Sequence, residues 1–298
     1  MQRLKPTTPV AEAEHVKIHC PLDGLYSFFN SPYPAHRLHA GVDIYCGGEF
    51  GGTTTSPVNG IVQMIRQVKA PKGKGFVDAG HDTIILIRTD ENPEVLVKLL
   101  HVDPLVEVGD HITTRDIVGT LIRSGYYGWG TSPHVHIEVR SFNDPLRARG
   151  GHIIRRLITP IYSNEPDKIG GYVIESRPEY SIIRLSGESY GLVGEIDGTC
   201  GVIDGGIPYY GWMGVHVDNP TKGEVKLQGK TIGEVKNVFP SSVIADTKKF
   251  RFELNGNEIL GLSLYLSPVK KPIAKALPLK IGTLILEEEQ MVEISVST

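Results

Sequence analysis

The chain has 298 residues, of which 40% are hydrophobic and 22% charged, the balance of an ordinary globular protein. Its net charge of −3 comes without any Lys/Arg-rich run, so neither nucleic acid nor an anionic membrane surface is an expected partner. No apolar stretch approaches the roughly 20 residues that a membrane span needs. The length allows two separate hydrophobic cores.

The first twenty residues carry some positive charge but lack the apolar core of about 7 to 15 residues that a secretory signal needs. We therefore expect a cytoplasmic protein as the sequence stands, and an extracytoplasmic one if a signal has been removed. Cys20, Cys46 and Cys200 form an odd set without a C-x-x-C pair. This favours free thiols and a reducing compartment over a disulfide framework.

Strand patterns dominate the chain, and helical periodicity is nearly absent. After an N-terminal arm (1–16), a first domain (17–159) alternates short β-branched runs with Gly, Pro and Asp/Asn. A linker rich in Pro, Gly and polar residues (160–171) precedes a β-rich second domain (172–298) with sandwich-like strand spacing. The fold class is therefore all-β. The clearest predicted strands cover residues 60–68, 82–89, 95–100, 172–177, 180–187, 223–229, 250–256 and 291–297.

Five polar residues in three runs of the first domain have the chemistry of a metal centre. His39 and Asp43 lie in LHAGVD, His101 in LLHVDP, and His134 and His136 in SPHVHIEV. Imidazole nitrogen and carboxylate oxygen are ligands that a catalytic Zn²⁺ prefers, and three of them leave a position open for water. The HVHIEV run alternates polar and apolar residues like a strand, so both of its histidines face one cleft.

The region from about Leu38 to Arg140 resembles the lysostaphin-type (LytM-like) zinc metallopeptidases. Their pattern is an H-x-x-x-D run, a later single His and an H-x-H strand. The match extends to SPVNGIV (56–62) and to a glycine-punctuated hairpin at 106–125, where Arg115 and Asp116 replace the usual Gly-Gln. The resemblance implies an antiparallel β-sheet peptidase domain over this region. It does not reach the second domain, whose role stays open.

The resemblance also implies residue roles. His39, Asp43 and His136 would bind one zinc ion, and His101 and His134 would be the uncoordinated catalytic pair. A neutral imidazole can accept a proton from water or donate a hydrogen bond to a developing oxyanion. We expect a zinc endopeptidase that hydrolyses peptide bonds without a covalent intermediate. Its expected substrates are peptidoglycan-like, with cell-wall-type cross-links or glycine-containing peptides.

Other residues near these motifs have weaker signals. Glu138 shares the strand face of the two histidines, where it either orients a ligand or forms an ordinary salt bridge. The remaining histidines are expected to be structural, with His36 and His81 the likeliest exceptions because they lie near the motifs. Cys46, three residues after Asp43, is not expected to contact the metal. No His is followed by Glu, so the helical H-E-x-x-H zinc signature is absent.

A glycine-rich loop before the H-x-H strand carries Tyr126, Tyr127 and Trp129. These aromatic side chains either line a groove for an extended peptide or pack the hairpin. A similar string at 209–217 lacks the second His and an H-x-x-x-D partner, so no second active centre is expected.

Two alternatives to the enzyme remain. The first is a non-catalytic, zinc-containing binding or regulatory module of the same fold, which would have no need for two spare histidines. The second is a phosphocarrier, which Asp43 disfavours because its carboxylate would repel a phosphohistidine. The sequence gives no indication of oligomeric state.

Overall fold

A computed structural model describes residues 6–159 and 168–297. Regular structure within these residues is β apart from one short helix, α1 (Pro34–Arg37), which confirms the predicted all-β class. The chain divides into two compact units. The first holds the chain up to Tyr26 together with Tyr33–Ile158, and the second holds Ser27–Pro32 and the chain from Thr159 on. Among the described residues no helix is long and apolar enough to cross a bilayer.

The strands of the first unit are mostly short, and several that follow one another in sequence pair as antiparallel neighbours. They are β1 (Thr7–Ala13), β2 (Val16–Pro21), β3 (Leu25–Ser27), β4 (Val42–Tyr45), β5 (Thr53–Thr55), β6 (Gly60–Lys69), β7 (His81–Thr89), β8 (Val95–Leu100), β9 (Val102–Pro104), β10 (His111–Ile112), β11 (Ile117–Leu121), β12 (Val135–Ser141) and β13 (Arg155–Arg156).

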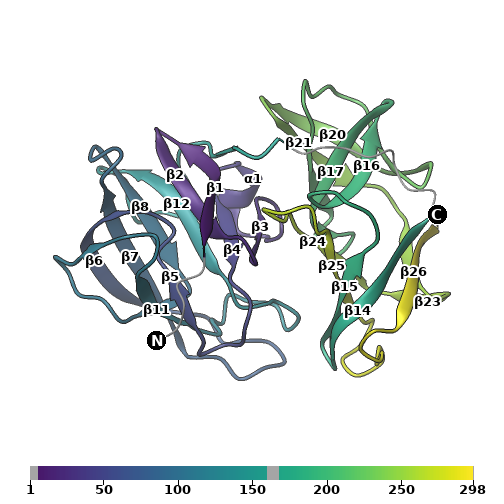
Figure 1. Cartoon of the computed structure of the whole chain (residues 1–298), viewed down its shortest axis with the longest axis horizontal. Coiled ribbons are helices and arrows are strands. Elements are labelled where there is room, and N and C mark those ends of the chain that lie inside the picture. The colour runs from purple at the N-terminus through teal and green to yellow at the C-terminus, as the bar shows by residue number, and fades with distance from the viewer. Residues whose placement is uncertain (1–5, 160–167, 298) are drawn as a thin grey trace. The chain divides into compact units, whose positions relative to one another are not determined.

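Seven of these strands form the main sheet, in the order β10-β6-β7-β8-β12-β4-β3 (Figure 1). The predicted strands at 60–68, 82–89 and 95–100 are its β6, β7 and β8. Two smaller sheets, β5-β11-β9 and β13-β1-β2, complete the unit. The order places β12, from the H-x-H run, between β8 and β4, although about 90 residues separate β4 from β12.

The central strands β8 and β12 are buried along almost their whole length, so both faces of the sheet are covered. On one face, Val97, Leu99 and Ile137 are fully buried. On the other, Leu96 and Leu100 pack with Ile84 and Leu86 in a smaller apolar cluster. Burying each such side chain stabilises the fold by about 1.5–3 kcal/mol, so the sheet is a rigid base for side chains on it.

Two predicted boundaries differ from what the structure describes. The expected N-terminal arm contains β1, which pairs with β2 from Thr7 opposite Pro21 to Ala13 opposite Val16, with a register shift between Pro9 and Ala11. The expected linker lies largely outside the described residues, since 160–167 are not among them, and its last residues begin β14 (Ile169–Arg177).

The second unit contains β14, β15 (Tyr180–Leu185), β16 (Leu192–Ile196), β17 (Thr199–Ile207), β18 (Trp212–His216), β19 (Glu224–Leu227), β20 (Lys230–Phe239), β21 (Ser242–Thr247), β22 (Arg251–Leu254), β23 (Asn257–Ile259), β24 (Gly261–Leu264), β25 (Ile273–Leu277) and β26 (Met291–Ser297).

All the strands of the second unit belong to one 13-stranded sheet. Its order begins β16-β19-β20-β21-β18-β17, and an additional pairing of β16 with β17 closes these six strands into a ring. The order continues β24-β25-β15-β14-β26-β22-β23. The sequence predicted sandwich-like strand spacing for this unit. In the structure its strands form one sheet, and part of that sheet closes on itself. Apolar residues of both parts form one core, with Ile203, Val215 and Leu262 fully buried.

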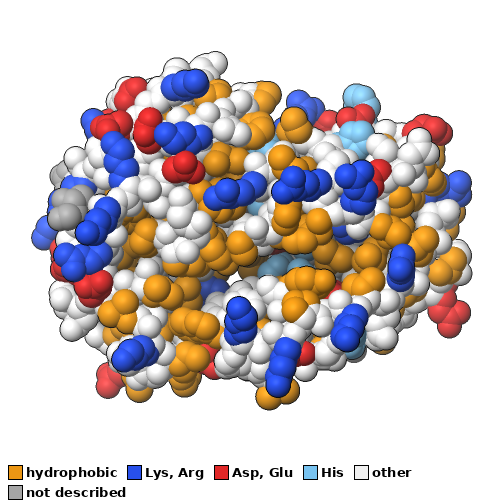
Figure 2. All heavy atoms as spheres, turned by 180° about the vertical axis from the view of Figure 1, so that it is seen from behind, with side chains coloured by type: hydrophobic (Ala, Val, Ile, Leu, Met, Phe, Trp, Pro, Cys, Tyr) orange, Lys and Arg blue, Asp and Glu red, His pale blue; other side chains and the backbone are white. Residues whose placement is uncertain are grey.

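Charged side chains are distributed over the surface. On the face in Figure 2, Lys and Arg side chains are scattered among apolar and acidic ones and do not gather into one patch. This distribution agrees with the small net charge of −3.

Candidate metal centre and neighbouring histidines

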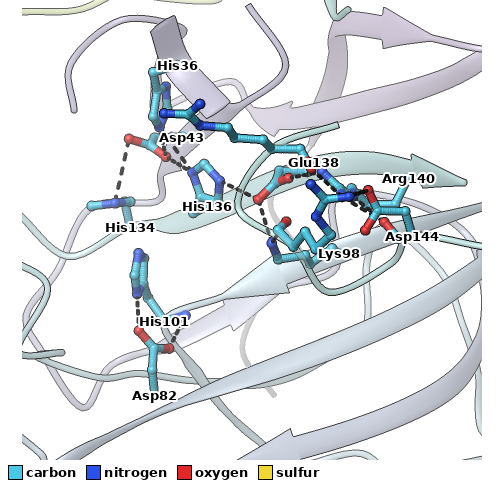
Figure 3. Close-up of polar contacts among 12 residues, drawn as sticks. His36, Asp43, Asp82, Lys98, His101, His134, His136, Glu138, Arg140 and Asp144 are labelled. Carbon is cyan, nitrogen blue, oxygen red and sulfur yellow. Dashed lines mark hydrogen bonds and ion pairs between the residues drawn. The ribbon is translucent and has the colours of Figure 1, made fainter. Parts of the chain in front are cut away.

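Three neighbouring strands of the first unit bring the sequence motifs together (Figure 3). His136 on β12 lies directly opposite Asp43 on β4 and opposite Leu100 on β8. Residues opposite one another in an antiparallel pair point to the same face, so Asp43 and His136 meet. His101 follows the end of β8, and His134 precedes β12 by one residue. Pairing in the sheet therefore assembles a site from segments far apart in sequence.

Asp43, His136 and His36 form a tight buried cluster. The His136 Nδ1 atom lies 2.8 Å from Asp43 Oδ1, and His36 Nε2 lies 3.1 Å from His136 Nδ1 and 3.3 Å from Asp43 Oδ1. Ligand atoms of the three residues all lie within 4.8 Å of one another. Two imidazoles and a carboxylate at this separation are a donor set that suits zinc.

The imidazole that joins Asp43 and His136 is that of His36, not the predicted His39. His36 belongs to the single-turn helix α1 and is fully buried. His39 is also buried, its backbone N–H donates to His36 O, and it adopts a left-handed φ of 57°. The ligand role of His39 stays a prediction. The only sequence signal for His36 was its closeness to the first motif.

The surroundings of Asp43 fit a bound cation. Burial alone would raise the pKa of its carboxyl, but the His36 and His134 imidazoles and the contact with His136 hold that pKa well below its usual range. In the part of the chain that the structure describes, Asp43 Oδ2 is buried and accepts no hydrogen bond. An ionised, buried carboxylate oxygen without a donor is costly unless a cation is bound to it.

Gly41 allows the segment between His39 and Asp43 to pass close to the cluster. A Cβ at this position would lie 2.8 Å from His136 Cε1, closer than real Cβ contacts. The glycine of the HAGVD run is therefore needed for the approach of the chain to the imidazole, which the sequence pattern alone did not explain.

His134 lies beside the cluster as a neutral imidazole. Its Nδ1–H donates to Ser132 O at 2.8 Å, because a carbonyl only accepts, and its Nε2 atom lies 3.6 Å from Asp43 Oδ2. Burial, only partly opposed by Asp43, lowers the pKa of His134 to about 4. The ring stacks on Tyr127, with centroids 4.9 Å apart.

His101 is held by Asp82, a residue that the sequence did not single out. The Nδ1–H of His101 donates to Asp82 Oδ2 at 2.6 Å, and its backbone N–H donates to Asp82 Oδ1 at 2.8 Å. Burial would raise the pKa of Asp82, but the His101 imidazole outweighs it and lowers that pKa to about 2. His101 also adopts a left-handed φ of 71°, a strained backbone of the kind found at functional sites. Its ring centroid lies 5.2 Å from that of His134.

On its other side His136 contacts Glu138, with 3.3 Å between His136 Nε2 and Glu138 Oε1. Burial lowers the pKa of His136, but the carboxylates of Asp43 and Glu138 outweigh it and raise that pKa to about 9. Glu138 thus contacts His136 and also forms ion pairs with Lys98 and Arg140, so the salt bridge considered from the sequence is present, and the orienting role stays a prediction.

The three aromatic side chains of the loop before β12 lie in different environments. Tyr127 is buried against His134 and His101, and its hydroxyl donates to His134 O at 3.3 Å. Tyr126 is 55% exposed, and Trp129 is half-buried with its carbonyl bonded by Arg123. Tyr127 therefore packs against His134 and His101, whereas Tyr126 is exposed on the loop and Trp129 is partly exposed.

Three further sequence candidates lie outside the cluster. His81 pairs with Asp103 at 2.7 Å, and Cys46 Sγ lies 3.3 Å from Thr54 Oγ1. His216, from the string at 209–217, contacts Asp204 within the second unit. Neither His81 nor Cys46 is a member of the described metal cluster, and His216 is in the other unit.

Comparison with known families gives two adjoining matches. Residues 20–156 match the model of the N-terminal domain of DUF8155, described as a domain of unknown function, and residues 171–295 match the model of its C-terminal domain. The two matches together span most of the chain. No curated protein matches it.

Several solved structures have a limited likeness to the chain, and they are peptidases of the M23 or lysostaphin type. A mutant catalytic domain of the prophage-encoded M23 protein EnpA from Enterococcus faecalis is 21% identical, with a TM-score of 0.25 and coverage of 38% of this chain and 72% of that one. A zinc-containing peptidase from Vibrio cholerae is 22% identical, with a TM-score of 0.25 and coverage of 46% and 44%. Lysostaphin is 14% identical, with a TM-score of 0.23 and coverage of 70% and 86%. At such TM-scores the chemistry of this chain has to be argued from its own side chains.

Proposed function

We propose that this chain, which belongs to the DUF8155 family through both of its domains, is a zinc-dependent endopeptidase. The observation that carries the proposal is the buried cluster of His36, Asp43 and His136 with two further imidazoles, His101 and His134, beside it. A site that only binds a metal has no use for two uncoordinated imidazoles. A hydrolase needs groups that move protons.

The residues of the cluster would hold the ion through Asp43 and the imidazoles of His36 and His136. A zinc ion there supplies a Lewis acid for the scissile carbonyl and makes water more acidic. The unbonded Asp43 Oδ2 and the donor set support zinc at this position.

The remaining imidazoles would handle protons and developing charge. His134 keeps its hydrogen on Nδ1 for Ser132 O, so its Nε2 lone pair can accept a proton from water. His101 likewise directs Nδ1–H to Asp82, which fixes its ring and supports the imidazolium that forms when Nε2 takes up a proton. After protonation either Nε2–H can donate to the oxyanion or to the leaving amine.

We propose a peptide substrate of extended shape, such as a cell-wall-type cross-link or a glycine-containing peptide. The exposed Tyr126 and the half-buried Trp129 on the neighbouring loop offer apolar surface with polar edges for such a chain. Digestion of muropeptides followed by mass spectrometry would identify the bond cleaved and, with it, the compartment in which the protein acts.

The test separates metal binding from catalysis. The parent protein should bind zinc stoichiometrically and cleave a quenched glycine-rich or wall-derived peptide, and chelation should abolish cleavage until zinc is restored. His134→Ala should keep its zinc and lose about 10²–10⁴-fold in kcat/KM, the range for a general acid or base. His111→Ala, an exposed histidine paired with Asp90, is the matched control and should behave as the parent does.

Cleavage by His134→Ala at the parent's rate would remove the catalytic role of that imidazole. A parent that binds zinc and retains peptides without cleaving any of them would instead be a non-catalytic binding module.

A further inference from the structure

A network of three buried charged side chains lies next to the proposed zinc site (Figure 3). Glu138 and Arg140 are fully buried and Lys98 is 1% exposed. Glu138 stands directly opposite Lys98 in the pairing of β12 with β8, and Arg140 follows two residues later on the same face of β12. Charged side chains are almost never buried this deeply unless they are paired. The partners of these three side chains therefore indicate what the network does.

Both carboxylate oxygens of Glu138 are held by cations. Lys98 Nζ donates to Oε1 at 2.7 Å, and Arg140 Nη1 donates to Oε2 at 2.9 Å. The cations are fixed in turn by backbone carbonyls of the loop after β12, Lys98 by Arg147 O and Arg140 by Asp144 O and Arg149 O. These hydrogen bonds fix the position and the orientation of the Glu138 carboxylate.

The carboxylate also faces His136, whose ring lies between two acids. Its Nδ1 atom is 2.8 Å from Asp43 Oδ1, and its Nε2 atom is 3.3 Å from Glu138 Oε1. A metal ligand must present a lone pair, and Nδ1 is the atom turned toward Asp43 and His36. The hydrogen of a neutral His136 must then sit on Nε2, where Glu138 is the acceptor.

Stability alone is a poor explanation for this network. Replacing a buried ion pair by apolar residues of similar volume is often neutral or stabilising, because taking charges out of water is costly. Leu96 and Leu100 already form an apolar cluster on this face of β8, so an apolar residue at position 98 would suit its surroundings. The charges instead converge on a carboxylate that contacts the candidate ligand His136.

We propose that Glu138, immobilised by Lys98 and Arg140, is a positioning residue that keeps the hydrogen of His136 on Nε2 and its Nδ1 lone pair directed at the metal. This inference rests on the proposed function for the identity of the ion. It also makes a statement about His136 that can be tested without any metal, since the Nε2–H bond to Glu138 exists in the metal-free protein.

Three variants test the proposal. Glu138→Leu removes the acceptor, Glu138→Gln keeps an acceptor oxygen but loses the charge, and Glu94→Gln changes an exposed glutamate as the matched control. The first readout is the Nε2–H signal of His136 in the ¹⁵N-histidine-labelled, metal-free full chain. The second is zinc affinity measured by competition with a chelator. Thermal unfolding of each metal-free variant shows that it is folded.

The parent and Glu94→Gln should show a slowly exchanging His136 Nε2–H. Glu138→Leu should lose this signal and bind zinc about 10–100-fold more weakly, the usual effect of removing a partner of a metal-ligating histidine. Glu138→Gln should keep the signal and lose less affinity. If Glu138→Leu fails to fold, Lys98→Met, which frees one oxygen of Glu138 from its cation, should show a smaller loss in the same two readouts.

A His136 Nε2–H that exchanges as fast in the parent as in Glu138→Leu overturns the proposal, and so does equal zinc affinity in folded parent, Glu138→Leu and Glu138→Gln. A parent that keeps the protected Nε2–H but binds no zinc contradicts the proposed function and leaves the positioning of His136 by Glu138 supported.

Discussion

His36 and His39 are only three positions apart in sequence, but the backbone presents their side chains differently. The turn of α1 carries His36 inward to Asp43 and His136, and His39 begins the left-handed bend from which the chain enters β4. Two histidines so near each other have similar sequence signals. The H-x-x-x-D spacing favoured His39, and the geometry of the cluster favours His36.

Replacing each histidine separately decides between them. Because His36 Nε2 lies about as close to His136 Nδ1 as to Asp43 Oδ1, we expect His36→Ala to lower zinc affinity by at least 10-fold. His39→Ala should have the smaller effect. Zinc competition with a chelator measures both, and the reverse order of effects would return the ligand role to His39.

Strand β25 in the second unit is apolar except for one lysine. Lys275 is 2% exposed, lies between Ala274 and Ala276, and has its Nζ 5.2 Å from the Tyr180 ring centroid. Burial lowers the pKa of this amine from 10.5 to about 7, and Glu175 opposes the shift only in part. The amine is thus uncharged in the folded protein over much of the alkaline range.

The lowered pKa predicts how stability changes with pH. Between pH 7 and pH 10.5 the unfolded chain binds more protons at Lys275 than the folded chain does, so the free energy of unfolding should rise with pH across this window. Below pH 7 the amine is protonated in both states, so the folded state carries the full free-energy cost of a buried charge. Lys275→Met should therefore stabilise the protein by a few kcal/mol at or below pH 7. Each tenfold loss of proton affinity at Lys275 on folding corresponds to about 1.4 kcal/mol.

Urea unfolding at pH 6.5 and pH 9.5 measures this difference. The gap between Lys275→Met and parent should shrink at the higher pH, whereas Lys280→Met, an exposed lysine on the following loop, should track the parent at both. A gap that stays constant with pH would show that Lys275 does not titrate in this window.

At the scale of the whole molecule, the chain does not divide at one linker. Ser27–Pro32 belongs to the second unit, although the residues on both sides of it belong to the first. Its anchor is Asp204 on β17, which is fully buried and accepts hydrogen bonds from Ser27 Oγ and from Phe28 N at 2.7 Å. His216 Nε2 lies 3.0 Å from the same carboxylate. A Cβ at Gly214 would clash with the Phe29 ring, so the unit is shaped around this segment.

Removing the anchor should therefore destabilise the second unit. Asp204→Ala leaves the Ser27 hydroxyl and the Phe28 N–H buried without their acceptor, and we expect it to lower the free energy of unfolding by about 3 kcal/mol. Urea unfolding measures the loss, with the exposed Glu288→Ala as control. Equal midpoints for Asp204→Ala and the parent would mean that Ser27–Pro32 contributes nothing to the unit.

Local pattern was enough to predict the all-β class and the main strands, because alternating β-branched runs between Gly, Pro and Asn-Gly turns can be recognised within six to ten residues. It also singled out His39, Asp43, His101, His134 and His136, because their residue types and their short spacings are local properties. These features need no knowledge of what lies across the sheet.

Tertiary structure alone decided what depends on the order of strands. The sequence does not say that β12 lies between β8 and β4, so it could not bring His36 to Asp43 and His136, find Asp82 behind His101, or place Lys98 against Glu138. These contacts join residues 7 to 100 positions apart. Such contacts are fixed by which side chains meet across a packed sheet, and no periodicity along one strand contains that information.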